Sequence, residues 1–326
     1  MIAYWLRKAH DREDGGTLLE RREQPVPQAT AGKMLVRVRA ASLNRGDLMA
    51  RIKRHGAADG RPAGVDGAGE VVDAGGSAFK VGERVMFRTH GCFAEYALVD
   101  PALTARVPDG LSWEEAGSIL AAFITGWEAA FKFGGLRKDE TVLIAGASSG
   151  VGVAALQMAK HIGARVIGTS GSARKLTQLK SLGMDVGIEA RGSAFTEGAL
   201  EATNGKGVNV AINLVGGTAF PGCVRAAADF GRVIIVGYVD NTMHADFDLE
   251  TVHGRRLQIS GISNTPLSPA QRAEAHRGFI NDFYPAFESG AIKPVIDRVF
   301  GFEDLPAAKA YVETDQLIGK VVVRMP

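Results

Sequence analysis

Apolar and polar residues alternate in short runs along the first third of the chain. The run from Met34 to Ala41 has this alternation at its centre, and a period of two residues is typical of a half-buried β-strand. Similar runs, with Gly, Pro and Asp between them, cover residues 69–72, 83–87 and 94–99. Short strands at close spacing, separated by turn residues, predict a small β-barrel or sandwich.

The pattern changes at Ser112, which together with Glu115 has the spacing of a capping box at a helix start. A largely apolar helix is predicted from there to about Phe133. Beyond it, helices alternate with strands that are apolar throughout. The predicted helices cover 151–162 and 173–182, and the strands cover 141–145, 165–169, 208–212, 232–236 and 257–261. Such strands are buried on both faces, so we expect an α/β domain with a doubly wound parallel sheet.

The C-terminal segment mixes both kinds of element. A helix over 269–289, a strand over 295–300 and a short helix over 303–312 precede a final apolar strand at 320–324. A chain of 326 residues exceeds the usual size of one domain. We therefore predict that residues 1–121 and 266–326 form one domain and that residues 122–265 form the parallel-sheet domain.

Composition excludes several classes of function. The chain carries 38 basic and 36 acidic residues, a net charge of +2, which favours neither nucleic acid nor an anionic membrane as the main partner. No apolar run is long enough to span a membrane, and the N-terminus lacks the apolar core of a signal peptide. Cys92 and Cys223 are the only cysteines, so we expect no disulfide framework and a cytoplasmic protein.

The turn between the first apolar strand and its helix, Ala145 to Gly152, is rich in small residues. Small residues let the backbone approach a pyrophosphate, which the free N–H groups of a helix start can bind. The strict G-x-G-x-x-G pattern is absent, and a tight turn without a ligand is the alternative interpretation. The predicted pyrophosphate contacts are Ser149, Gly150, Val151 and Gly152.

The end of the second apolar strand indicates which dinucleotide binds. A site for NAD usually has a carboxylate about twenty residues beyond the turn, but residues 168–175 contain no acid. Hydroxyl groups and two cations stand there instead, and a 2′-phosphate needs donors and positive charge. We predict NADP(H), with Ser170, Gly171, Arg174 and Lys175 around the phosphate. In the alternative, the two cations merely solvate a helix face.

Several segments together resemble the medium-chain dehydrogenase/reductase superfamily, and within it the zinc-free quinone oxidoreductase (zeta-crystallin-like) branch. They occur in the family's order and are 41–47, 64–71, 81–85, 92–96, 145–152, 157–160 and 319–322. The resemblance implies a GroES-like β-barrel domain that binds substrate and is built from both chain ends. It also implies a central Rossmann domain, a cofactor cleft between the two, and a homodimer.

The resemblance also implies roles for single residues. Asn44 is the candidate catalytic residue and a cofactor contact, beside the nicotinamide or the substrate oxygen. A local turn or cap hydrogen bond is its alternative role. Thr125 matches a family position beside the nicotinamide. The other expected cofactor contacts follow later strands or stand near the C-terminus, and they are Val215, Gly216, Val236, Gly237, Tyr238, Ile262 and Lys320.

The positions that bind catalytic zinc in related alcohol dehydrogenases are held by Asn44, Val65 and Ala121. Catalytic zinc needs three ligands of the Cys, His or Glu type, so we predict that no metal is bound. Without a Lewis acid the favoured substrates accept hydride readily. The sequence therefore predicts an enzyme that reduces quinones or α,β-unsaturated carbonyls with NADPH by direct hydride transfer.

Two other functions stay open. One is an enoyl-thioester reductase of the same superfamily, with a basic patch for coenzyme A phosphates at Arg45, Arg51, Lys53, Arg54 and Arg61. The other is a non-catalytic NADPH-binding protein. The chain also departs from the branch in two places. Met49 and His55 stand where many quinone reductases have tyrosines, and Ala190 and Arg191 fill the region of a tyrosine that often flanks the adenosine phosphate.

Overall fold

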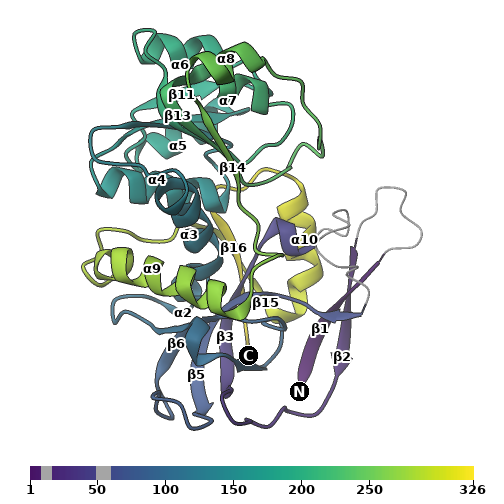
Figure 1. Ribbon diagram of the computed structural model, residues 1–326. Coiled ribbons are helices and arrows are strands. Elements are labelled where there is room, and N and C mark those ends of the chain that lie inside the picture. Colours follow the sequence, from purple (N-terminus) through teal and green to yellow (C-terminus); the bar gives the residue numbers. More distant parts are fainter. Residues whose placement is uncertain (9–16, 49–59) are drawn as a thin grey trace. The chain divides into compact units, whose positions relative to one another are not determined.

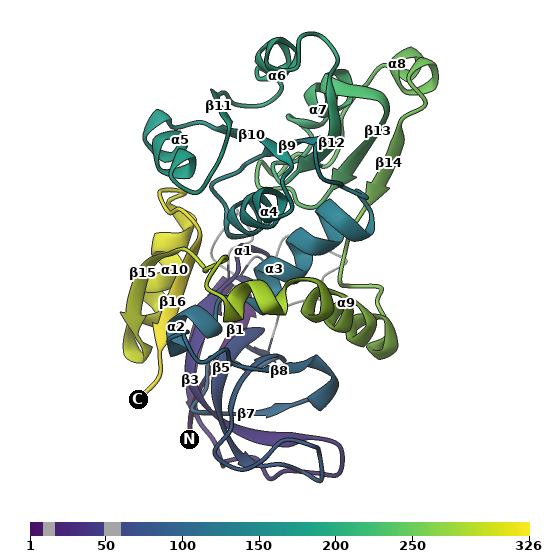
Figure 2. The same cartoon turned by 90° about the vertical axis from the view of Figure 1, so that its left-hand side faces the viewer.

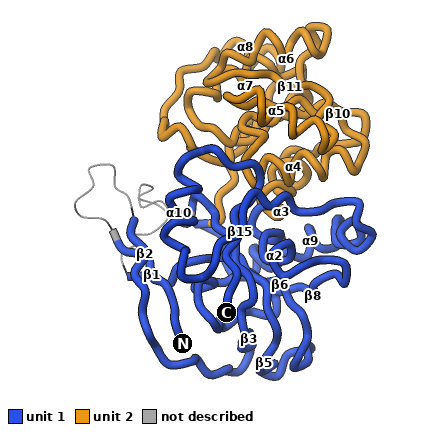
Figure 3. The backbone as a smooth tube through the Cα atoms, turned by 180° about the vertical axis from the view of Figure 1, so that it is seen from behind, with its two compact units in different colours: residues 1–122, 265–326 blue, residues 123–264 orange. Residues whose placement is uncertain are grey.

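The computed structural model describes residues 1–8, 17–48 and 60–326. The chain divides into two compact units (Figure 3). Unit 1 comprises residues 1–122 and 265–326, and unit 2 comprises residues 123–264. No helix among the described residues is both long enough and apolar enough to cross a membrane.

Unit 2 is built on a sheet of six parallel strands in the order β11-β10-β9-β12-β13-β14 (Figure 2). Their bounds are β9 (Thr141–Ala145), β10 (Arg165–Ser170), β11 (Val186–Glu189), β12 (Val208–Asn213), β13 (Ala227–Ile235) and β14 (Gln258–Gly261). The chain moves outward from β9 in one direction and from β12 in the other. Ligands of such sheets bind at this switch point, beyond the carboxyl ends of the strands.

Helices cover both faces of this sheet. The connection through α4 (Gly150–His161) leads from β9 to β10, and the one through α7 (Phe220–Ala226) leads from β12 to β13 in the opposite direction. Because both crossovers are right-handed, the two helices lie on opposite faces (Figure 2). The remaining helices of the unit are α5 (Ala173–Lys180), α6 (Thr196–Ala202) and α8 (Leu249–Gly254). The predicted doubly wound parallel sheet is confirmed.

The sequence predicted a single helix from Ser112 to about Phe133, but the structure divides this segment. It forms α2 (Trp113–Ala116), α3 (Leu120–Trp127) and a π-helical turn at Glu128–Lys132. The predicted capping box of Ser112 and Glu115 is present. The C-cap of α2 is Gly117, where an added Cβ would lie 2.8 Å from the carbonyl oxygen of Ala40, so the end of α2 packs closely on β3.

Unit 1 contains a seven-stranded sheet and a three-stranded sheet (Figure 1). The larger one runs β15-β16-β3-β5-β6-β8, with β7 paired to β3, and the smaller one runs β2-β1-β4. Their bounds are β1 (Ile2–Lys8), β2 (Thr17–Glu23), β3 (Met34–Leu43), β4 (Arg61–Pro62), β5 (Asp66–Asp73), β6 (Arg84–Arg88), β7 (Tyr96–Val99), β8 (Thr104–Arg106), β15 (Ile296–Gly301) and β16 (Lys320–Arg324). Sequence patterns had not predicted β1 or β2.

The C-terminal strand explains why both chain ends belong to one unit. Strand β16 pairs antiparallel with β3, with Val321 opposite Leu43 and Val323 opposite Ala41. Both valines are buried in the core of unit 1. The helices of this unit are α1 (Arg45–Leu48), α2, α9 (Pro269–Glu288) and α10 (Leu305–Glu313), with short 3₁₀ turns at Pro101–Leu103 and Phe302–Asp304.

Candidate functional site

The turn after β9 has the geometry of a pyrophosphate site. The Ser149 hydroxyl caps α4, because its Oγ accepts a hydrogen bond from Gly152 N at 3.1 Å and donates one to Gly146 O at 2.9 Å. The amides of Gly150 and Val151 lie in the first helical turn, where backbone N–H groups have no intrahelical acceptor. A Cβ on Gly152 would lie 2.7 Å from the carbonyl oxygens of Gly146 and Ala147. The residues present therefore fit a diphosphate.

Two further loops at the carboxyl edge of the sheet carry most of the other predicted contacts in unit 2. Val236 N donates to Asn213 O at 2.9 Å, and Ile262 N donates to Ile235 O at 2.9 Å. These bonds place Val236 and Ile262 directly beyond the paired strands. Gly237 and Tyr238 follow Val236 in the chain, and the ring of Tyr238 is exposed.

Asn213 and Asp240 shape the loop of Val215 and Gly216, and sequence reasoning missed both. The Asn213 side chain is buried; its Oδ1 accepts from the Val215 and Gly216 amides, both at 3.0 Å, and its Nδ2 donates to Gly216 O. The Asp240 carboxylate accepts from the Thr218 amide and hydroxyl. Gly216 has a φ of 131°, and a Cβ there would overlap that carboxylate. The available signal was a polar residue, Asn213, directly after the apolar residues 210–212.

At the end of β10 the structure places a further cation, Arg191, while the phosphate contacts of Arg174 and Lys175 stay a prediction. Arg174 donates to Gln178 Oε1 at 3.1 Å along the exposed face of α5. Arg191 instead lies against Gly171, where an added Cβ would be 2.9 to 3.1 Å from its guanidinium atoms. Arg191 makes no ion pair within the described part of the chain. Ser170, the last residue of β10, is buried. The available signal was that Ala190 and Arg191 fill the region of the expected tyrosine.

Asn44 and Lys320 belong to unit 1 and bind each other. The Lys320 side chain is buried, and its Nζ donates to Asn44 Oδ1 at 2.5 Å and to the carbonyl oxygen of Leu43 at 3.1 Å. Asn44 Nδ2 is buried and has no hydrogen-bond acceptor among the described residues. The predicted contacts of Asn44 and Lys320 with the cofactor stay predictions, as does the predicted place of Thr125, on α3, beside the nicotinamide.

A buried carboxyl group, Asp66, lies in the same unit. It accepts hydrogen bonds from Ser42 Oγ at 3.0 Å and from Ala121 N at 3.2 Å. Burial raises the pKa of Asp66 to about 6, although the charges of Lys320 and Arg88 act in the opposite direction. Sequence reasoning had not singled out this residue, because a single Asp in an apolar run is not specific by itself.

The side chains that could bind zinc are described for residues 1–8, 17–48 and 60–326. There, no group of three or more His, Cys, Asp or Glu side chains is placed to hold a metal ion. Of the positions compared with zinc ligands, Val65 and Ala121 offer no ligating side chain, and the amide oxygen of Asn44 faces Lys320.

Several predicted positions are not part of the structural description. Met49, His55, Arg51, Lys53 and Arg54 lie outside the described residues. Of the proposed basic patch, Arg61 lies in β4, and Arg45 donates to the carbonyl oxygen of Val312 at 2.8 Å and pairs with Asp315.

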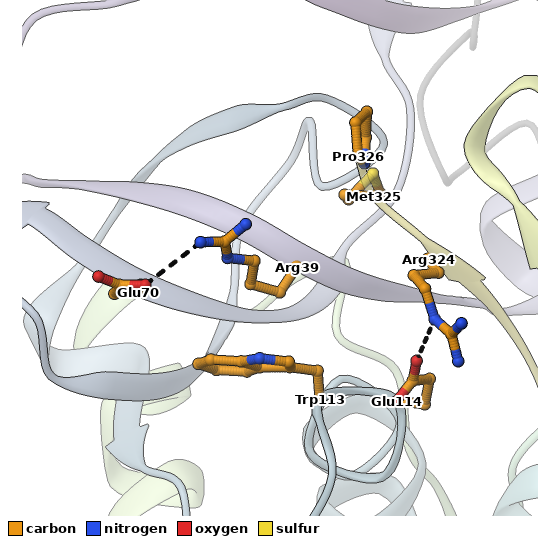
Figure 4. A pocket seen from close by; sticks show the side chains of 7 residues that line it. All are labelled: Arg39, Glu70, Trp113, Glu114, Arg324, Met325 and Pro326. Atoms are coloured by element: carbon orange, nitrogen blue, oxygen red, sulfur yellow. Dashed lines mark hydrogen bonds and ion pairs between the residues drawn. The ribbon is translucent and has the colours of Figure 1, made fainter.

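A surface hollow of about 270 Å³ in unit 1 contains none of the predicted site residues (Figure 4). It is lined by Arg39, Glu70, Trp113, Glu114, Arg324, Met325 and Pro326. Its charges are already paired, with 3.4 Å between Arg39 and Glu70 and 2.6 Å between Arg324 and Glu114. The hollow is therefore not a candidate for the predicted chemistry.

Comparison with known proteins agrees with this architecture. Residues 30–109 match the family model described as alcohol dehydrogenase GroES-like domain, and residues 150–275 match the one described as zinc-binding dehydrogenase. Prostaglandin reductase-3 of Bos taurus is 31% identical over 331 residues, a stretch that covers 94% of this chain and 85% of that protein. The polyketide synthase lcsB of Purpureocillium lilacinum is 28% identical over 303 residues, which cover 90% of this chain.

The chain spans only about an eighth of lcsB, 12% of its length, and a similarly small part of the other polyketide synthases that it matches. Among solved structures, an NAD-dependent alcohol dehydrogenase has a TM-score of 0.85 at 28% identity, with both chains covered completely. Mycobacterial Rv1454c in complex with NADPH has a TM-score of 0.86 at 25% identity, covering 99% of this chain and all of that one. This chain belongs to the medium-chain dehydrogenase/reductase superfamily of oxidoreductases.

Proposed function

We propose that the protein is a zinc-independent reductase that transfers a hydride from NADPH to a quinone or an α,β-unsaturated carbonyl compound. The observation that carries the proposal is the sheet edge of unit 2. There, the first-turn amides of α4 fit a diphosphate, and the end of β10 offers Arg191 beside Gly171. In this proposal unit 2 binds the dinucleotide and unit 1 provides the substrate-binding residues.

The cofactor is NADP(H), in agreement with the NADPH complex of the similar Rv1454c. When bound, it supplies the hydride. The residues that would hold it are those of the turn at 149–152, the loops at 215–216 and 236–238, Ile262, and the end of β10. Glu189 stands opposite Ser170 in the register of β10 and β11 and is exposed. The Glu189 carboxylate, which would suit the ribose hydroxyls of NAD, thus lies two residues before the Arg191 guanidinium, which would suit the 2′-phosphate of NADP. We propose that Arg191 makes the site prefer NADP(H).

A conjugated substrate suits the groups at Asn44. Its Nδ2 is a buried donor that lacks an acceptor in the described residues, and a carbonyl or quinone oxygen is an acceptor. The side chains of Val65 and Ala121 give zinc no ligand, so the protein would rely on hydrogen bonding and on positioning of the reactants. Prostaglandin reductase-3 is a relative named as a reductase, which supports reduction as the direction of the reaction.

An enoyl-thioester reductase is the second candidate, favoured by the match to part of several highly reducing polyketide synthases. NADPH oxidation should be followed by its absorbance with three panels: quinones, free enones and enoyl-thioesters of coenzyme A. We expect turnover with quinones or free enones. Turnover restricted to thioesters would establish the second candidate, and tight NADPH binding without oxidation by any panel would indicate a non-catalytic binding protein.

We propose two further properties of the protein as a whole. A homodimer is proposed from the family resemblance, and β14, which ends the strand order and pairs only with β13 among the described residues, offers a sheet edge for it. Molar mass from light scattering tests this. A cytoplasmic location is proposed because Cys92 and Cys223 are both buried free thiols, as a reducing compartment would keep them.

A further inference from the structure

We infer that Lys320 holds the Asn44 amide in one orientation, so that Asn44 donates a hydrogen bond to the substrate oxygen that becomes negative during reduction. This inference rests on the proposed function and deepens it. Asn44 would be the catalytic residue, in direct contact with substrate. Lys320 would be a positioning residue that acts through Asn44.

The orientation of the amide follows from the chemistry of an ammonium group. Lys320 Nζ lies 2.5 Å from one end of the Asn44 amide. An ammonium donates hydrogen bonds and cannot accept them, so that end must be the amide oxygen. The other end is then the NH₂ group, which cannot exchange places with the oxygen without pointing a donor at a cation.

The NH₂ group is the part of the pair that is left without a partner. Asn44 Nδ2 is buried, and no acceptor for it exists among the described residues. A buried donor without an acceptor costs free energy, and such a group in a native structure calls for an explanation. Lys320 is itself well satisfied, because it also donates to Leu43 O at 3.1 Å. A ligand oxygen at Nδ2 would satisfy the remaining donor.

The positive charge of Lys320 is balanced inside unit 1. Asp66 is completely buried and attracts Lys320, which lowers the pKa of that carboxyl group against the effect of burial. Ser42 Oγ and Ala121 N donate to the two carboxylate oxygens. Above the Asp66 pKa of about 6 the carboxylate offsets the buried ammonium charge. The buried ammonium group of Lys320 thus has a buried carboxyl group as its neighbour, and its hydrogen bond keeps the amide oriented.

The step that this arrangement assists balances without a further reactant. Hydride adds to the β-carbon of the enone, the carbon–carbon π electrons move toward oxygen, and an enolate forms. The Asn44 N–H donates to that oxygen and keeps its proton. A proton from water then adds to the α-carbon, so that enone, NADPH and H⁺ give the saturated ketone and NADP⁺. The hydrogen bond strengthens as negative charge develops, which is the condition for catalysis.

The decisive variant is Asn44→Asp, because it keeps the shape and removes the donor. A carboxylate would accept from Lys320 and would leave no orphan N–H. We expect a melting temperature equal to or above that of the wild type. We also expect an NADPH Kd within about threefold of wild type and a kcat with the best enone about 100-fold lower, as for the loss of one oxyanion donor. A purely structural Asn44 predicts the reverse pattern, lower stability with kcat retained.

Lys320→Met tests the positioning role. The freed amide can turn, so we expect kcat to fall about tenfold with little change in KM, and no further loss when this change is added to Asn44→Asp. Lys309→Met is the matched control, a second buried lysine of unit 1 that binds Glu313, and its kcat should equal that of the wild type. If Lys320→Met does not fold, Asn44→Asp decides alone.

An Asn44→Asp enzyme with wild-type kcat would overturn the inference and leave the proposed function standing. Failure of the wild-type protein to oxidise NADPH with any acceptor would instead refute the proposed function, so the two failures are distinguishable.

Discussion

Two buried titratable groups in unit 1, Asp66 and His276, should change the free energy of unfolding with pH in opposite directions. Burial raises the pKa of Asp66 from 3.8 to about 6. Burial lowers the pKa of His276 on α9 from 6.5 to about 4, although a hydrogen bond with the Thr104 backbone opposes it. Between pH 4 and 6 the folded protein therefore holds a proton on Asp66 and none on His276, whereas the unfolded chain holds a proton on the histidine and none on the aspartate.

The two proton differences cancel in the wild-type protein. Each group binds one proton in only one of the two states, and one such proton changes the free energy of unfolding by about 1.4 kcal/mol per pH unit. Asp66→Asn leaves only His276, for which the unfolded state binds more protons. Because each group is half titrated near one end of the range, the stability of that variant should rise by about 2 kcal/mol from pH 4 to pH 6, relative to wild type. His276→Gln leaves only Asp66, and stability should fall by a similar amount over the same range.

Urea unfolding of the wild type and the two variants at half-unit intervals from pH 4 to pH 6.5 measures these slopes. All other groups contribute equally, so the differences from wild type isolate the two sites. The double variant should regain the wild-type slope. Parallel curves for the wild type and Asp66→Asn would show that the Asp66 carboxyl titrates normally in the folded protein, and the reasoning from burial would then be refuted.

Three other predictions concern binding, stability and metal. Arg191→Ala should raise the NADPH Kd about 5- to 30-fold with little change for NADH, because a charge-assisted bond at an exposed site contributes about 1 to 2 kcal/mol. Gly171→Ala, which displaces the Arg191 guanidinium, should also weaken NADPH binding, and its effect should not add to that of Arg191→Ala. Arg174→Ala should weaken NADPH binding less. Fluorescence titration measures these Kd values, and equal losses for NADPH and NADH would contradict the assignment of Arg191 to the phosphate. Arg232→Met should lower the free energy of unfolding by about 2 to 4 kcal/mol, because Arg232 binds Glu140 at 2.7 Å and the carbonyl oxygens of residues 134 and 135 while largely buried. Arg7→Ala, at a half-exposed pair, should cost under about 0.5 kcal/mol in the same denaturation experiment. Dialysis against a chelator should leave turnover unchanged; lost activity that zinc restores would disprove the zinc-independent proposal.

Local patterns alone were enough to indicate the class of fold. The central strands β9 and β12 of unit 2 are largely apolar because both of their faces are covered, and this is visible without knowledge of their neighbours. The capping box of Ser112 and Glu115 is also local, since its donor and acceptor lie three residues apart. The place of the dinucleotide turn was predictable for the same reason, as strand, small residues and helix follow one another directly.

The partners of the candidate site residues were decided by tertiary structure. Lys320 reaches Asn44 across 276 residues because β16 pairs with β3. Arg191 reaches Gly171 because β11 returns beside β10, and Asp240 meets Gly216 because neighbouring parallel strands end at one edge. A sequence pattern records the preferences of nearby residues, whereas these contacts depend on strand order and register. For the same reason residues 174–175 could be predicted as phosphate ligands from their place in the chain, whereas the approach of Arg191 to Gly171 became visible only in the fold.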